Sequence, residues 1–227
     1  MPEQLTPALS PLQGEPEPPT PQEEEGELPE QPERTNTPPL IVAKASEGKY
    51  VVYRGILDRF KAFAGQKKPQ ALLALFGESV SATIKQDPPI GLSDGKTAIT
   101  ITVDLGENGI APNFGFRGAS LKSLGKDGSK WEVVALPEAR RFDATLTIMV
   151  GERVIDYPLT IAPPVDANLD KNDALGERDF ALFLKEKGTD KSPRFDLNGD
   201  GKRDYVDEFI FTANYLVAVK AAKGKAK

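Results

Sequence analysis

The chain of 227 residues contains no cysteine and no histidine. The missing cysteine excludes disulfides and thiol chemistry. The missing histidine excludes histidine-ligated zinc or haem and every Ser–His or Cys–His catalytic pair. Carboxylate pairs of the kind that cleave glycosidic bonds remain available. The acidic residues of the central region lie mostly beside glycine turns, where solvated carboxylates are expected without a catalytic role. We therefore predict that the protein is not an enzyme.

Long apolar runs, a strong positive charge and an export signal are also lacking. No stretch of about 18 apolar residues occurs, so no membrane span is predicted. The formal net charge of -5 provides no basic footprint for a nucleic acid. Met1 leads into proline, glutamate and glutamine, so no secretory signal is predicted in this copy. One interpretation is that the start of translation, with any export signal, lies upstream of Met1.

Residues 1–41 are dominated by proline and glutamate and contain little that could be buried. This composition predicts a disordered, acidic, proline-rich linker. The alternative is a functional spacer, such as a stalk that crosses a cell wall.

Residues 49–66 have apolar side chains at helical spacing. Val52, Ile56, Phe60 and Phe63 fall on one face of a helix, and Gly65 is placed to end it. The segment is predicted to be an amphipathic helix. Its apolar face either packs on its own domain or binds a partner.

Residues 70–163 change to a period of two. The run from Ala98 to Leu105 alternates strictly between apolar and polar residues, and residues 144–150 and 155–161 repeat the pattern. About seven short strands separated by glycine, proline and aspartate turns are typical of an antiparallel sandwich of immunoglobulin-like type. At the level of this pattern the region resembles bacterial Ig-like domains.

Residues 196–207 form an acidic loop of twelve residues that leads directly into an apolar run. Calcium takes six to eight oxygen ligands, which one loop can supply from positions 1, 3, 5, 7, 9 and 12 if it turns sharply at position 6. Gly201 occupies that position and can adopt a positive φ. The predicted ligands are Asp196, Asn198, Asp200, Lys202 through its backbone carbonyl, Asp204 and Asp207.

A second acidic loop lies thirty residues upstream, at 166–177. Lys171 replaces the turn glycine there, so this loop is expected to bind calcium more weakly than residues 196–207. The predicted ligands are Asp166, Asn168, Asp170, Asn172 and Glu177.

Residues 164–218 resemble the tandem calcium-binding repeat of dockerins, because position 12 of the C-terminal loop is aspartate and each loop leads into one helix. The resemblance implies a small α-helical module of paired F-hands, two bound Ca²⁺ ions and a protein partner. In dockerins that bind cohesins, positions 10 and 11 help to recognise the partner. Here they are Leu175-Gly176 and Tyr205-Val206 rather than a Ser-Thr pair, so a cohesin partner is left open. A basic tail, 219–227, follows.

Position 8 of the two loops carries Asp173 and Arg203, where paired loops of this type normally carry aliphatic residues. Opposite charges across a short antiparallel bridge attract, so we predict an ion pair between them. The alternative is that both side chains point into solvent.

These features together predict a multidomain, mainly β protein with a C-terminal helical module. Weak calcium loops fill at the millimolar calcium found outside the cytoplasm, which indicates a secreted, cell-surface or periplasmic protein. Two functions stay open. In the first, the calcium-ordered module docks a protein partner in adhesion or cell-surface assembly. In the second, calcium is a structural staple, and the sandwich binds a ligand such as a polysaccharide.

Overall fold

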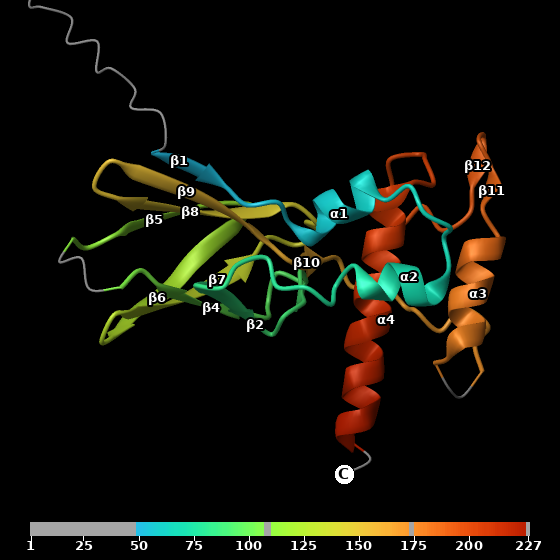
Figure 1. Ribbon diagram of the computed structural model, residues 1–227. Coiled ribbons are helices and arrows are strands. Elements are labelled where there is room, and N and C mark those ends of the chain that lie inside the picture. The colour runs from blue at the N-terminus through green and yellow to red at the C-terminus, as the bar shows by residue number, and fades with distance from the viewer. Residues whose placement is uncertain (1–48, 107–109, 173–174, 226–227) are drawn as a thin grey trace, which may run out of the picture. The chain divides into compact units, whose positions relative to one another are not determined.

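The computed structural model describes residues 49–106, 110–172 and 175–225, so the predicted linker 1–41 lies outside the described residues. The described chain is mostly β-sheet and ends in a long helix (Figure 1). In chain order the elements are β1 (Tyr50–Val52), α1 (Ile56–Ala62), α2 (Pro69–Ala74), β2 (Ile84–Asp87), β3 (Gly91–Leu92), β4 (Ile99–Asp104), β5 (Asn113–Arg117), β6 (Ala119–Asp127), β7 (Lys130–Pro137), β8 (Ala144–Val150), β9 (Arg153–Leu159), β10 (Ile161–Ala162), α3 (Glu177–Lys185), β11 (Gly188–Thr189), β12 (Ser192–Pro193) and α4 (Tyr205–Lys225).

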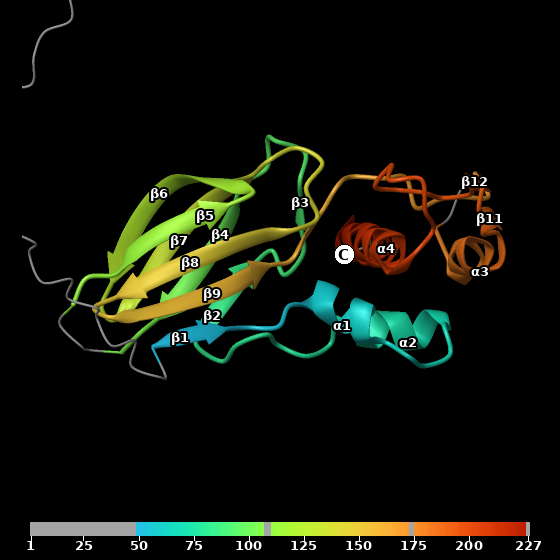
Figure 2. The ribbon, with the colours of Figure 1, turned by 90° about the horizontal axis from the view of Figure 1, so that it is seen from above.

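Most of the strands belong to two four-stranded sheets, which lie one above the other in Figure 1 and overlap in the view from above in Figure 2. One sheet has the order β1-β9-β8-β5 and the other β2-β4-β7-β6. Within them all pairs are antiparallel except β1 with β9. The short strands β10 and β3 form a separate parallel pair, and β11 and β12 form a hairpin.

The two sheets share one hydrophobic core. Ile99, Ile101 and Val103 of β4 are buried, as their alternation predicts, and they join Leu146 and Ile148 of β8 in one cluster. Successive side chains of a strand point to opposite faces, so the intervening threonines lie on the outer face. Trp131 is only partly buried, at the margin of this cluster.

The predicted helix at 49–66 is wrong in its first third. Tyr50–Val52 is strand β1, paired with β9, and the Val52 side chain is 60% exposed. Helix α1 begins only after Gly55, whose N–H donates to the Asp58 carboxylate at 2.9 Å. A Cβ at Gly55 would lie 2.8 Å from Cγ of Pro158, so a side chain there would clash with β9. Pairing with the sheet therefore overrides the helical periodicity before residue 56.

The predicted start of the β region at residue 70 is also wrong. Pro69–Ala74 forms helix α2, with proline in its first turn, where the missing N–H is tolerated. Leu72 is fully buried among helices rather than between the sheets. Short apolar runs fit a helix or a strand equally well, so periodicity alone does not separate the two here.

The helices form a second hydrophobic core around α4. Phe209 of α4 lies 5.7 Å from the ring of Phe60 on α1 and 5.7 Å from that of Phe76, just after α2. Phe60 and Phe76 are themselves 5.6 Å apart, so the three rings are in mutual contact. Helix α4 extends well beyond α1 and α2 (Figure 1). It therefore includes residues 219–225, which were predicted to be a basic tail.

A buried side chain ties α4 to the strand that leaves the sheets. Asn214 is 5% exposed; its Oδ1 accepts the Val165 N–H at 3.0 Å and its Nδ2 donates to the Pro163 carbonyl at 2.9 Å. Ala162 of β10 is buried in the helical core. The helical core and the sheets are thus joined through the segment at 162–165. None of the helices described is long and apolar enough to cross a membrane.

We expect Phe209→Ala to destabilise the protein by about 3–5 kcal/mol, because it removes the ring through which α4 packs against α1 and leaves a cavity. Urea unfolding, followed by helical circular dichroism, measures the change. Val52→Ala is the control, since this exposed position should move stability by no more than about 0.5 kcal/mol. A Phe209→Ala variant as stable as the control would show that the helical core does not depend on this contact.

Candidate calcium-binding loops

The loop at 196–207 wraps around its first carboxylate. Asp196 accepts hydrogen bonds from the backbone N–H groups of Gly199 at 2.8 Å, Asp200 at 3.1 Å and Gly201 at 2.8 Å. Gly199 and Gly201 have φ values of 76° and 82°, which side chains other than glycine rarely adopt. The two glycines therefore let the loop turn back on Asp196.

Of the other predicted ligands of this loop, Asp200 and Lys202 are exposed, and Asn198 and Asp204 are half-buried. Asp200 accepts the N–H of Lys202 at 2.9 Å and the side-chain amide of Asn198 at 3.0 Å. Asp204 accepts the N–H of Val206 at 2.8 Å. These carboxylates are held by backbone and amide donors, and each oxygen has a further lone pair for a cation.

Asp207 closes the loop from the first turn of α4. Its side chain is fully buried, with Oδ1 accepting the Leu197 N–H at 2.6 Å and Oδ2 accepting the Asp204 N–H at 2.7 Å. Burial raises the pKa of this carboxyl above its ordinary value, although these hydrogen bonds and the nearby Arg203 act in the opposite direction. Where too little positive charge surrounds a buried carboxyl, a bound cation stabilises its ionised form.

Asp179 holds the upstream loop in the same way. It is fully buried in α3; its Oδ1 accepts the Leu169 N–H at 2.7 Å, and its Oδ2 accepts the Gly176 N–H at 2.9 Å. In both loops the donors therefore lie ten and three residues before the closing aspartate. Burial acts to raise the pKa of Asp179, but three backbone hydrogen bonds together lower it.

These equivalent bonds relate the repeats by 28 residues, so residues 168–179 correspond to 196–207. Lys171 supports this alignment, because its φ of 56° matches the left-handed Gly199, 28 residues later. Phe183 and Phe211 are also 28 residues apart, and their rings stack at 3.9 Å with an interplanar angle of 8°. The two halves thus share their core as well as their loops.

The predicted alignment at thirty residues is corrected by this geometry. Asp166 and Glu177 no longer occupy positions 1 and 12. Asp166 is paired with the Lys171 ammonium at 2.5 Å, and Glu177 is exposed at the start of α3. Asn168, Asp170 and Asn172 move to positions 1, 3 and 5. Asp179, which the sequence reasoning missed, takes position 12.

A buried oxygen of the upstream loop has no partner among the described residues. Oδ1 of Asn168 is buried and accepts no hydrogen bond from that part of the chain, while its Nδ2 donates to the Asn172 carbonyl at 2.6 Å. Buried polar atoms are nearly always satisfied, and a cation at position 1 would satisfy this one. Within the described ranges, however, no group of three or more acidic side chains is placed to hold a metal ion. The residue types fit calcium, and ligation by either loop stays a prediction.

The predicted ion pair involves Asp173, which lies outside the described residues. Its proposed partner, Arg203, is buried: the guanidinium carbon lies 3.8 Å from the centre of the Phe183 ring. Nη2 donates to the Phe183 carbonyl at 3.4 Å, and Nη1 is 4.0 Å from Oε1 of Glu208. Arg203 therefore fastens the second loop to helix α3, so the expectation that it points into solvent is wrong.

Comparisons with known proteins leave this site without a family. No family model matches the chain, and no curated protein matches it. Among solved structures, the adhesin InvE of Yersinia pseudotuberculosis is similar over 37% of this chain and 27% of its own, with 17% identity and a TM-score of 0.31. That likeness is too weak to support an argument. The resemblance to dockerins therefore remains one of residues and spacing.

The corrected alignment makes a prediction about ion counting. Asp179→Asn should abolish calcium binding at the upstream loop, because it removes the charge at position 12, whereas Glu177→Gln should keep it. Isothermal titration should count two calcium ions for the wild type and for Glu177→Gln, and one for Asp179→Asn. The opposite pattern, with one ion lost in Glu177→Gln only, would restore the thirty-residue alignment.

Proposed function

We propose that this protein is a non-enzymatic calcium-binding protein of the extracytoplasmic space. Two calcium loops would order a dockerin-like helical module that is fixed to an immunoglobulin-like β-sandwich. The observation that carries the proposal is the pair of buried carboxylates, Asp179 and Asp207, each bonded to its loop through donors at the same two spacings. Acidic loops closed in this way at a helix start suit a hard, oxygen-seeking cation.

The strand order supports the immunoglobulin-like part of the proposal. A constant-type immunoglobulin domain has strands A, B, E and D in one sheet and C, F and G in the other. The sheet β2-β4-β7-β6 follows the first order in sequence, and β9-β8-β5 follows the second. Strand β1 adds a parallel edge to β9, and the helices α1 and α2 lie between β1 and β2.

The packing around α4 favours calcium as a structural staple. Glu208, directly after the closing aspartate, is 4% exposed. It accepts a hydrogen bond from the Lys67 ammonium, in the α1–α2 segment, at 2.8 Å. Phe209 follows and packs between Phe60 and Phe76. An ion at 196–207 would therefore fix the start of α4, and through these two residues the placement of α1 and α2.

The docking role has support from α3. Its buried face carries Phe180 and Phe183, whereas Arg178 has a side chain 83% exposed and Lys185 is also exposed. Calcium would order this helix together with its loop. A protein partner in adhesion or cell-surface assembly would meet that outer face, and it would dissociate when calcium is removed.

The polysaccharide alternative concerns the outer face of the β1-β9-β8-β5 sheet. Tyr50 is 61% exposed there and donates its hydroxyl to Asp156, which also accepts the Thr147 hydroxyl at 2.6 Å. Exposed aromatic rings beside fixed carboxylates and hydroxyls are suited to sugar binding. In this role calcium stabilises the fold, and no protein partner is needed.

Calcium should stabilise the protein, because it binds the folded loops and not the unfolded chain. At 100 times the dissociation constant, one site adds about 2.7 kcal/mol to the free energy of unfolding. Urea unfolding with calcium and with chelator measures the gain. Asp196→Ala should remove the contribution of the tighter site, and Asp127→Ala, an exposed acid at the end of β6, is the matched control.

An equal free energy of unfolding in calcium and in chelator would refute both versions of the proposal. If calcium stabilises the protein, affinity capture at high and low calcium separates them. Loss of a captured partner in chelator, with Trp131 fluorescence unchanged, supports docking. A partner that stays bound, or a sugar that binds in either condition, supports the staple.

A further inference from the structure

A large cavity lies between the far half of α4 and the edge of the sheets. Its volume is about 940 Å³, within the range of about 300–1,000 Å³ that is typical of small-molecule sites. The α1–α2 region forms one wall, strands β2 and β3 form another, and the C-terminal turns of α4 form the third. Its apolar lining includes Ile56, Phe76, Ile90, Tyr157, Leu216 and Val219.

The apolar lining remains accessible because α4 is longer than the helices that pack against it. Helices α1 and α2 cover only the first half of α4 (Figure 1), so Leu216 and Val219 in the second half are only partly buried. Ile90, in the segment that leads into β3, is also partly buried. Apolar surface that remains in a concave site is a favourable place for an apolar ligand.

The charged residues of the lining are mostly of one sign. Lys85, Lys220 and Lys223 line the cavity with exposed side chains, against one acidic residue, Glu78. No described carboxylate forms an ion pair with any of the three lysines. This rim is positive in a chain whose net charge is -5. An occupant should therefore combine an apolar body with a negative end.

We propose that this cavity binds a small amphiphilic anion, such as an aliphatic carboxylate. The hydrocarbon part would lie against Phe76, Ile90 and Leu216, and the carboxylate would lie at Lys220 and Lys223. A second copy of this chain is a poorer occupant, because two lysine rims would face each other and repel. This inference does not depend on calcium binding or on the proposed function.

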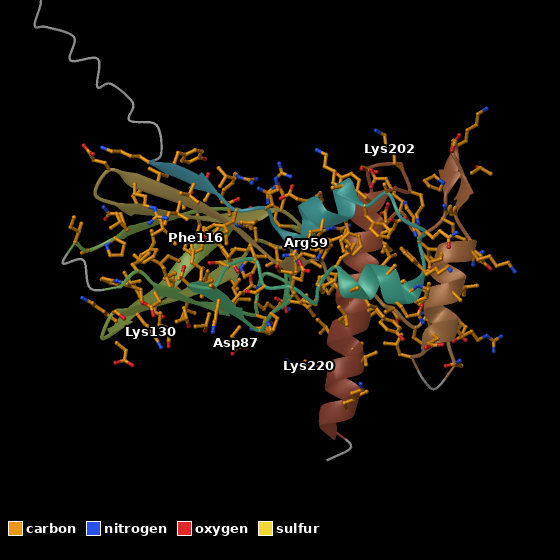
Figure 3. All side chains as sticks on the ribbon, in the orientation of Figure 1. Arg59, Asp87, Phe116, Lys130, Lys202 and Lys220 are labelled. Carbon is orange, nitrogen blue, oxygen red and sulfur yellow. The ribbon has the colours of Figure 1, made fainter. Side chains whose placement is uncertain are left out.

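Decanoate below its micelle concentration is the probe, with decanol as its neutral counterpart. Lys220→Glu combined with Lys223→Glu should weaken decanoate binding by about five- to tenfold, since two surface charges are reversed. Lys130→Glu is the matched control, because Lys130 is an exposed lysine on β7, far from Lys220 (Figure 3). Ile90→Trp, which places a larger ring in the cavity, should abolish binding of both probes.

Circular dichroism and the melting temperature establish that each variant folds. The proposal fails if decanoate does not bind the wild type, or if decanol binds as tightly as decanoate. It also fails if the double reversal and Lys130→Glu weaken binding equally. A dimer in sedimentation experiments that decanoate does not dissociate would assign the surface to a second copy and overturn the proposal as well.

Discussion

Two buried aspartates, Asp179 and Asp207, hold the two acidic loops of the C-terminal helical module in place. Each sits in the first turn of a helix and accepts one backbone N–H from near the start of the preceding loop and one from its end. The bonds satisfy donors that the irregular loop would otherwise leave unpaired, and a carboxylate in the first turn is favourable for the helix dipole. Taking a carboxylate out of water is costly, however, and for Asp207 burial outweighs the compensation, since its pKa is raised. A cation beside this acidic loop would stabilise the ionised form of the Asp207 carboxyl.

The residues that follow Asp207, the closing aspartate of the second loop, contact the rest of the fold. The next residues, Glu208 and Phe209, reach Lys67, Phe60 and Phe76 in the segment between β1 and β2. The helical module is therefore not an independently packed unit. Its core is completed by α1 and α2, which lie in sequence between β1 and β2. Calcium bound at a loop would therefore also affect how this segment packs.

The sequence was sufficient for the parts of the fold that depend on strict local patterns. The alternation in β4, β8 and β9 and the turn glycine Gly201 left little freedom. Helix α2 was missed because the apolar run at 72–76 suits either kind of element. The upstream loop was misaligned because aspartate or asparagine occupies every second position from 166 to 172, so two frames fit the ligand pattern. The hydrogen bonds of Asp179, together with the left-handed backbone of Lys171, distinguish them.

Hydrogen exchange at the amides of Leu169 and Leu197 would show directly whether the two loops bind calcium. These N–H groups donate to the closing carboxylates, so both should be protected in the free protein, and both should exchange more slowly when calcium binds. Amides of β4, within the sheets, should change little and serve as the internal reference. If the two leucine amides exchange at the same rates with saturating calcium and with chelator, the loops do not bind calcium through their closing aspartates.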